Sequence, residues 1–200
     1  MIPPIWEPAV YDRDAAERLS RAMGLEPVIA RLLVQRGLSD PDEASRFLQP
    51  SLDHLHDPGL LTGMPEAVAR IEQAIAAGER IVIHGDYDVD GITSTVILRR
   101  ALELLGAQVG HFIPDRLRDG YGLQPATVDR LHADGARLVI SVDCGIRGHE
   151  AADRARELGV DLVITDHHEP GPALPACCAV LNPKRHDCRY PDKHLAGVGV

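Results

Sequence analysis

The sequence predicts an α/β fold in which a mostly parallel sheet is flanked by helices. Five short runs rich in apolar and β-branched residues are typical of buried strands, at 81–84, 108–113, 137–142, 161–165 and 178–181. Segments with helical spacing of apolar residues separate most of these runs, and the intervening loops are short. Regular alternation of strand and helix favours a parallel sheet covered by helices.

Residues 1–63 are expected to form a helical segment that precedes the sheet-containing domain at 64–200. Apolar residues at helical spacing predict a helix over 26–36, and Gly37 is placed to end it. A second helix opens at Asp40, which is expected to be the N-cap. Pro41 then takes the first helical position, Glu43 completes a capping box, and the helix ends near residues 48–50.

The remaining elements follow the same local signals. Residues 51–63 form a connector in which His54 and His56 are expected to be loop residues, since no carboxylate-bearing strand end adjoins them. Helices are predicted over 65–77, 92–105, 125–132 and 148–158, and glycines end the first two at Gly78 and Gly106.

Composition predicts a soluble chain that is large enough for one sizeable core or for a core plus an appendage. The chain has 200 residues, 44% of them hydrophobic, and no apolar run of membrane-spanning length. The first seven residues do not resemble a signal peptide, and the four cysteines lack a C-x-x-C spacing. We therefore expect a cytoplasmic protein with reduced thiols, no structural zinc and no membrane partner.

The net charge of −9 argues mildly against a general nucleic-acid-binding surface. It does not exclude such a substrate, because two divalent ions would add about four positive charges at the site itself.

Metal-capable residues follow three of the predicted strands. The carboxyl ends of parallel strands lie at one edge of a sheet, so these side chains are expected to converge. The candidates are His84, Asp86, Asp88 and Asp90 after the first strand, Asp143 after the third, and Asp166, His167 and His168 after the fourth. A mixture of imidazole and carboxylate suits a divalent transition metal such as Mn²⁺.

Each aspartate by itself has a simpler interpretation. An aspartate after a strand is usually a turn former or a helix N-cap, and Asp90 is well placed to cap the next helix. Taken together, carboxylates converging to about 4 Å would repel by about 4 kcal/mol per pair at an effective dielectric constant of about 20. Such a cluster requires cations.

Three segments resemble the motifs of the DHH phosphoesterases: HGDYDVDGITST at 84–95, SVDCGI at 141–146 and ITDHH at 164–168. Further segments are similar to the members of that family that degrade single-stranded DNA, at 47–52, 55–58, 120–123, 182–185 and 195–200. The resemblance runs from about residue 47 to the last residue, and the joint occurrence of these segments makes it specific.

The resemblance implies metal-dependent hydrolysis of phosphodiester bonds that releases 5′-mononucleotides from the 5′ end of single-stranded DNA, in repair and recombination. Two ions, Mn²⁺ or Mg²⁺, would stabilise the attacking and leaving oxygens. The resemblance assigns His84 and Asp88 to one ion and Asp90 and His167 to the other. It makes Asp143 the bridging ligand and places His168 near the scissile phosphate. Asp86 and Asp166 are expected to orient a ligand imidazole or a bound water.

Basic and aromatic residues near the strand ends are candidates for substrate binding. Arg116 and Arg118 are expected to contact backbone phosphates and Tyr121 to stack on a base, although a solvated loop is the simpler alternative. Lys184 and Arg185 are either phosphate contacts or a surface charge cluster.

In the family, the Ala-Gly-Val-Gly-Val segment opens a helix, followed by another metal-binding aspartate, a DHH-associated domain and an oligonucleotide-binding domain. The sequence stops at Val200, so we expect a truncated form with little activity alone. The competing interpretations are another DHH activity, on pyrophosphate, short oligonucleotides or cyclic dinucleotides, and a non-catalytic nucleic-acid-binding fragment. Besides single-stranded DNA, other repair proteins are candidate partners.

Overall fold

A computed structural model describes residues 9–200, which form two compact units that meet at residues 55 and 56. Residues 1–7, on which the expectation about a signal peptide rests, lie outside this range. The sequence-based boundary was placed at 63/64. Residues 56–63, which include the 3-10 helix η2 (Pro58–Leu60), were therefore predicted to belong to the helical segment, whereas they belong to the second unit. None of the described helices is long and apolar enough to cross a membrane.

The first unit consists of three short helices, α1 (Arg13–Met23), α2 (Pro27–Gln35) and α3 (Pro41–Leu48), followed by the 3-10 helix η1 (Leu52–His54). They pack around a small core of Leu19, Ala30, Leu33 and Ala44. The predicted helices at 26–36 and 41–48 are confirmed, and Asp40 accepts hydrogen bonds from the backbone N–H groups of Asp42 and Glu43 at 2.9 and 3.1 Å. Helix α1 was not predicted individually, although Asp12 caps it in the same manner.

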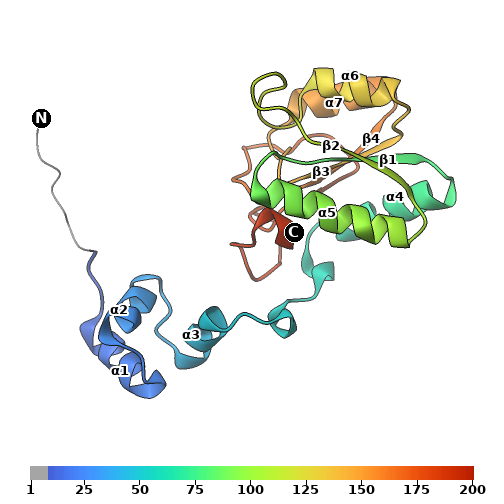
Figure 1. The fold of residues 1–200 in the computed structure, drawn as a ribbon. Coiled ribbons are helices and arrows are strands. Elements are labelled where there is room, and N and C mark those ends of the chain that lie inside the picture. Colours follow the sequence, from blue (N-terminus) through green and yellow to red (C-terminus); the bar gives the residue numbers. More distant parts are fainter. Residues whose placement is uncertain (1–8) are drawn as a thin grey trace, which may run out of the picture. The chain divides into compact units, whose positions relative to one another are not determined.

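The second unit is built on a five-stranded sheet in the order β2-β1-β3-β4-β5, and every pairing is parallel (Figure 1). The strands are β1 (Arg80–His84), β2 (Gln108–Phe112), β3 (Leu138–Val142), β4 (Asp161–Thr165) and β5 (Ala179–Leu181). The fold class predicted from the sequence is confirmed, and each strand boundary lies within one residue of its prediction.

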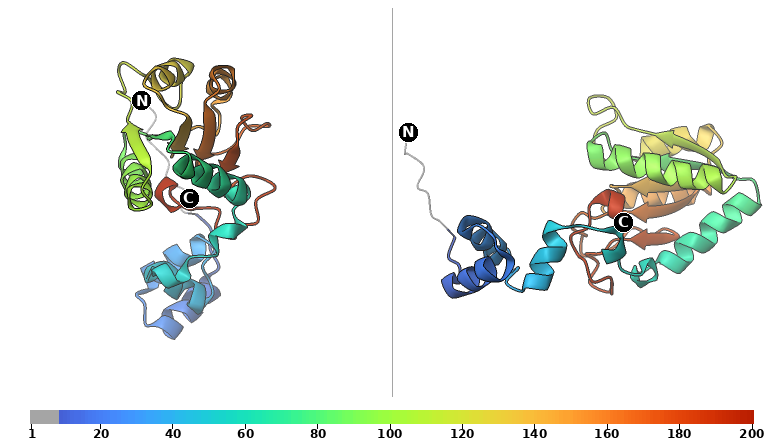
Figure 2. Two further views of the ribbon diagram at one scale, coloured as in Figure 1. Left: turned by 90° about the vertical axis from the view of Figure 1, so that its right-hand side faces the viewer. Right: turned by 60° about the horizontal axis from the view of Figure 1, so that its bottom comes forward.

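Helices cover both faces of the sheet: α4 (Met64–Ala76) and α5 (Val89–Leu104) lie on one face, and α6 (Pro125–Ala133) and α7 (His149–Leu158) on the other (Figures 1 and 2). The alternation of side chains along β1 shows how the two cores form. Ile81 and Ile83 join the core beneath α4 and α5, whereas Val82 joins the core beneath α6 and α7. Because both faces of the central strand β3 are covered, all five of its residues are buried and four of them are apolar, whereas the edge strand β2 is more exposed and includes Gln108 and His111.

The order of the strands reverses between β1 and β3. The chain leaves β1 toward β2 on one side, and β3 leads to β4 and β5 on the other. Such a reversal creates a crevice at the carboxyl ends of the two central strands, where α/β proteins bind ligands. Helix α5 starts at Val89, earlier than the predicted residue 92, because Asp88 rather than Asp90 is its N-cap and accepts the Gly91 N–H at 3.0 Å.

Candidate metal centre

Asp143, the first residue after β3, lies at the centre of this crevice. Its side chain is buried, with the residue 1% exposed, and its Oδ1 atom has no hydrogen-bond partner within residues 9–200. Burial, reinforced by the carboxylates of Asp90 and Asp88, raises the pKa of Asp143 to about 7. A buried carboxylate oxygen without a partner is unusual in a folded protein, and it is suited to bind a cation.

Asp143 also has a backbone conformation that few side chains tolerate. Its φ of 61° makes it the only non-glycine residue with positive φ in the described part of the chain. Aspartate and asparagine enter this left-handed region more readily than other residues. The turn therefore places a carboxylate directly over the strand end.

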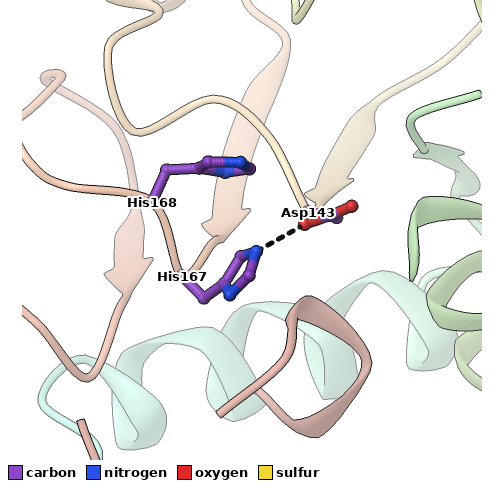
Figure 3. Close-up of side chains that lie close together, drawn as sticks. All are labelled: Asp143, His167 and His168. Atoms are coloured by element: carbon purple, nitrogen blue, oxygen red, sulfur yellow. Dashed lines mark ion pairs between the residues drawn. The ribbon is translucent and has the colours of Figure 1, made fainter. Parts of the chain in front are cut away.

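Two groups of potential ligands share Asp143. One contains Asp143, His167 and His168, and the other contains Asp86, Asp88 and Asp143, with the ligand atoms of each group within 4.8 Å of one another. Figure 3 shows both imidazoles of the first group, from the loop after β4, directed toward Asp143. This arrangement is the one expected of a carboxylate that bridges two ions.

His167 presents its Nε2 atom to two carboxylates. The distances from Nε2 are 3.2 Å to Oδ1 of Asp143 and 3.8 Å to Oδ2 of Asp90. Its Nδ1 atom lies 2.9 Å from the carbonyl oxygen of Leu195, which can only accept, so Nδ1 carries the proton in the neutral ring. The lone pair of Nε2 then points at the carboxylates, as required of a metal ligand.

Asp90 lies in the first turn of α5, and its carboxylate also contacts the C-terminal segment of the chain. Its two oxygens accept the N–H groups of Gly197 and Val198, each at 2.7 Å, from the 3-10 helix η3 (Gly197–Gly199). Gly197 approaches the centre so closely that a methyl group in its place would overlap Oδ1 of Asp143. A carboxylate has about four lone-pair sites, so these bonds leave Asp90 able to bind a cation.

His84, the last residue of β1, lies outside both groups but is fully buried, and its Nε2 atom has no hydrogen-bond partner among the described residues. Its ring stacks on Phe112 at 5.6 Å, and Nδ1 lies 3.4 Å from the sulfur of Cys144. Burial lowers the pKa of His84 to about 4, so the ring is neutral, which is the form that binds metals.

Asp86 and Asp166 have different surroundings, although the sequence suggested similar roles. The Oδ1 atom of Asp166 accepts the N–H groups of His167 and His168 and lies 2.7 Å from Nδ1 of His168, while Oδ2 accepts the N–H of Ile146 at 2.9 Å. Asp166 thus orients His168 and the loop. Asp86 uses one oxygen on the Tyr87 N–H at 2.7 Å and is within reach of Asp88 and Asp143.

Aromatic side chains line the edge of the centre. The hydroxyl oxygen of Tyr121 lies 3.5 Å from Nε2 of His168, and its ring is 6.4 Å from that of Tyr87. The guanidinium of Arg116 lies over the Tyr87 ring at 5.4 Å. Sequence reasoning did not single out Tyr87, although an aromatic residue between two metal-capable aspartates was the available signal. Burial raises the pKa of Tyr121, so its hydroxyl remains a donor.

The other predicted substrate-binding residues form contacts within the fold. Arg118 is exposed and pairs with Asp115 at 3.5 Å, and Lys184 lies 3.4 Å from Glu169. Arg185 has a structural role instead: its side chain is only 12% exposed, pairs with Asp187 through two atoms at 2.9 and 2.8 Å, and donates to the carbonyl of Val180. Its guanidinium is therefore not available to a phosphate.

The thiols are all free, as expected, and Cys144 is the one that touches the candidate centre. His54 lies in η1, and the ring of His56 packs edge-on against Tyr190.

The fold and the centre define the class of protein. Residues 80–200, which contain the whole sheet and all the candidate ligands, match the DHH family, N-terminal domain, and the chain belongs to that family. It is 45% identical over 195 residues to the single-stranded-DNA-specific exonuclease RecJ of Bacillus subtilis, covering 98% of this chain and 25% of the relative.

Two solved structures of RecJ are similar to this chain in fold. RecJ of Thermus thermophilus in complex with Mn²⁺ matches with a TM-score of 0.66 and 34% identity, over 94% of this chain and 26% of that one. Its complex with Mg²⁺ matches with a TM-score of 0.53 and 29% identity, over 94% and 22%. The chain therefore spans about a quarter of the length of these relatives.

Proposed function

We propose that this chain forms the catalytic part of a metal-dependent exonuclease that degrades single-stranded DNA from its 5′ end in the cytoplasm, during repair and recombination. The observation that carries the proposal is Asp143, a buried carboxylate shared by two groups of potential ligands and lacking a hydrogen-bond partner at Oδ1. The RecJ relatives are specific for single-stranded DNA, which supports the choice of substrate. The direction of degradation follows from the resemblance of the three motifs.

The proposed ions are Mn²⁺ or Mg²⁺, as in the two RecJ complexes. Asp143 would bridge them. Asp90 and His167 would hold one ion, and Asp88 and His84 the other, with Asp86 either beside them as a ligand or orienting a water. The donors fit the ions because Nε2 of His167 faces the carboxylates unprotonated in the neutral ring, and because Nε2 of His84 and Oδ1 of Asp143 have no hydrogen-bond partner among the described residues.

When bound, the two ions would supply the positive charge that stabilises the attacking and leaving oxygens. The residues of the chain position the phosphate. Asp166 accepts the Nδ1–H of His168, which leaves Nε2 of that ring free to contact the scissile phosphate. The Tyr121 hydroxyl is positioned to donate to a phosphate oxygen beside it.

Contacts with the strand would come from the edge of the crevice. Tyr87 and Tyr121 offer faces for base stacking, and Arg116 offers a cation for the backbone. Arg118 and Lys184 are paired with Asp115 and Glu169 and would add only general attraction to phosphates. We do not assign Arg185 a contact because its guanidinium is engaged within the fold.

The test compares 5′-labelled single strands, 3′-labelled single strands and blunt duplexes in Mn²⁺. It uses this chain and a chimera that adds the remaining C-terminal part of the Bacillus subtilis relative. We expect the chimera to release mononucleotides from the 5′ end of single strands and to spare blunt duplexes, with the chain alone much weaker. Equal digestion of both substrates, or preference for pyrophosphate, would move the assignment to another DHH activity. Manganese binding without hydrolysis in either protein would identify a non-catalytic binding fragment.

A further inference from the structure

A cavity of about 760 Å³ adjoins the candidate metal centre on the side of α6 and α7. Its walls come from residues 121–125 at the start of α6, from residues 145–151 at the start of α7, and from Asp166, His168 and Glu169 after β4. The volume lies within the range of about 300–1000 Å³ that is typical of small-molecule sites.

The cavity is continuous with the centre through His168. His168 and Asp166 line the cavity, and His168 also belongs to the first group of potential ligands. Tyr121, another wall residue, lies 3.5 Å from the His168 ring nitrogen. A molecule in the cavity would therefore lie directly beside a phosphate held at the metal centre.

The lining combines an apolar wall with one cation. Leu123 and Ile146 are buried wall residues, and the Tyr121 ring is half exposed beside them. Arg147 donates from Nε to the backbone carbonyl of Glu169 at 3.1 Å and forms no ion pair within residues 9–200, so its terminal nitrogens remain available. Glu150 and Glu169 also line the cavity, and the Glu169 carboxylate pairs with Lys184 at 3.4 Å. With Asp166 they make the lining more acidic than basic, which disfavours a highly charged anion there.

We infer that this cavity binds the base and sugar of one nucleotide that flanks the scissile phosphate, and that Arg147 contacts the phosphate joined to that sugar. The inference rests on the proposed function. The apolar wall and Tyr121 suit a base, whereas the carboxylates and the single cation suit a nucleoside with one phosphate better than a polyphosphate. Arg147 is a binding residue in this scheme and takes no part in bond cleavage.

The test measures equilibrium binding of 2-aminopurine deoxyriboside 5′-monophosphate to the 200-residue chain by fluorescence, with Mn²⁺ present. Arg147→Ala should weaken binding about tenfold or more because it removes a charge-assisted contact, and Arg147→Lys should recover part of the loss. His149→Trp, which adds bulk to an exposed wall residue, should also weaken it. Arg100→Ala is the matched control, since Arg100 lies on α5 across the sheet and pairs with Glu103.

Manganese titration of the same variants separates this inference from the proposed function. All variants should bind Mn²⁺ as the wild type does, because neither Arg147 nor His149 is a candidate ligand. Wild-type nucleotide affinity in both Arg147→Ala and His149→Trp would overturn the inference and leave the metal centre intact. If the wild type did not bind Mn²⁺, the proposed function would be overturned. Binding of the unphosphorylated nucleoside, measured without metal, would still test the cavity in that case.

Discussion

The Nε2 atom of His167 lies 3.2 Å from Oδ1 of Asp143. The contact places two acceptors face to face in the neutral form of the ring, because the proton on Nδ1 is committed to the carbonyl of Leu195. Oδ1 of Asp143 gains no other hydrogen bond from residues 9–200. A divalent cation satisfies both atoms at once, and the predictions below follow from that requirement.

Asp143→Asn should remove most Mn²⁺ binding and, in the metal-free protein, raise the midpoint of thermal unfolding. Asparagine keeps the shape of the side chain and tolerates the φ of 61° at this position, but it removes a charge that is buried near Asp88 and Asp90. We expect Mn²⁺ affinity to fall by more than about 100-fold, since even residues that only support a ligand can change affinity by that amount. Calorimetric titration and thermal melts of metal-free protein measure the two effects.

The matched control is Asp134→Asn, which neutralises an exposed carboxylate at the end of α6. It should change neither quantity. If Asp143→Asn bound Mn²⁺ with wild-type affinity and stoichiometry, Asp143 would not be a ligand.

In metal-free protein, the stability of the wild type relative to Asp143→Asn should fall as the pH rises from about 4 to about 7. The comparison cancels the opposite contribution of His84, whose pKa is lowered to about 4. Asp143 has its pKa raised to about 7 in the folded state, whereas an unfolded aspartate titrates near 3.9. Between these values the folded state holds a proton that the unfolded state has released, so the free energy of unfolding falls with increasing pH. Urea denaturation of chelator-treated wild type and Asp143→Asn at several pH values measures this difference in stability.

Saturating Mn²⁺ should reverse the trend, because the cation binds the ionised carboxylate and stabilises the folded state more strongly as the pH rises. A difference in metal-free stability between the wild type and Asp143→Asn that does not change from pH 4 to 7 would show that the Asp143 carboxyl is already neutralised by other means.

Asp166→Asn should destabilise the fold by about 2–4 kcal/mol, because buried N–H groups would lose a charged acceptor. Asp166 accepts backbone N–H groups from His167, His168 and Ile146, and its residue is only 1% exposed. Asp153→Asn, on the exposed face of α7 where Asp153 pairs with Arg156, should cost less than about 0.5 kcal/mol. Similar urea midpoints for the two variants would contradict the role assigned to Asp166.

The sheet was predictable from the sequence because its signals are local. Each strand is a short apolar run, and the run at 161–165 coincides with β4. The convergence of Asp143 with the residues after β1 and β4 was also predictable, since it follows from the rule that ligands bind at strand ends. The environments of individual side chains were not predictable from the sequence, because they depend on tertiary contacts. Sequence alone could not distinguish Asp166, saturated by backbone N–H groups, from Asp86, or show that Arg185 is enclosed by Asp187 and Val180.

Packing around the turn after β1 leads to the last prediction, Gly91→Ala. A methyl group on Gly91 would lie 2.5–2.7 Å from the backbone N, the Cα and the Cβ of Asp86, and these atoms cannot move without shifting the turn. We expect a loss of stability of about 1–3 kcal/mol from this overlap. Because the same turn carries Asp88, Mn²⁺ affinity should fall further than the lost stability alone explains.

Gly110→Ala in β2 is the control, since a methyl group there meets nothing closer than the Arg80 side chain at 3.8 Å. Urea denaturation and manganese titration should show wild-type behaviour for Gly110→Ala and losses in both measurements for Gly91→Ala. Unchanged Mn²⁺ affinity in a destabilised Gly91→Ala protein would mean that the turn from Asp86 to Asp88 does not hold the ion.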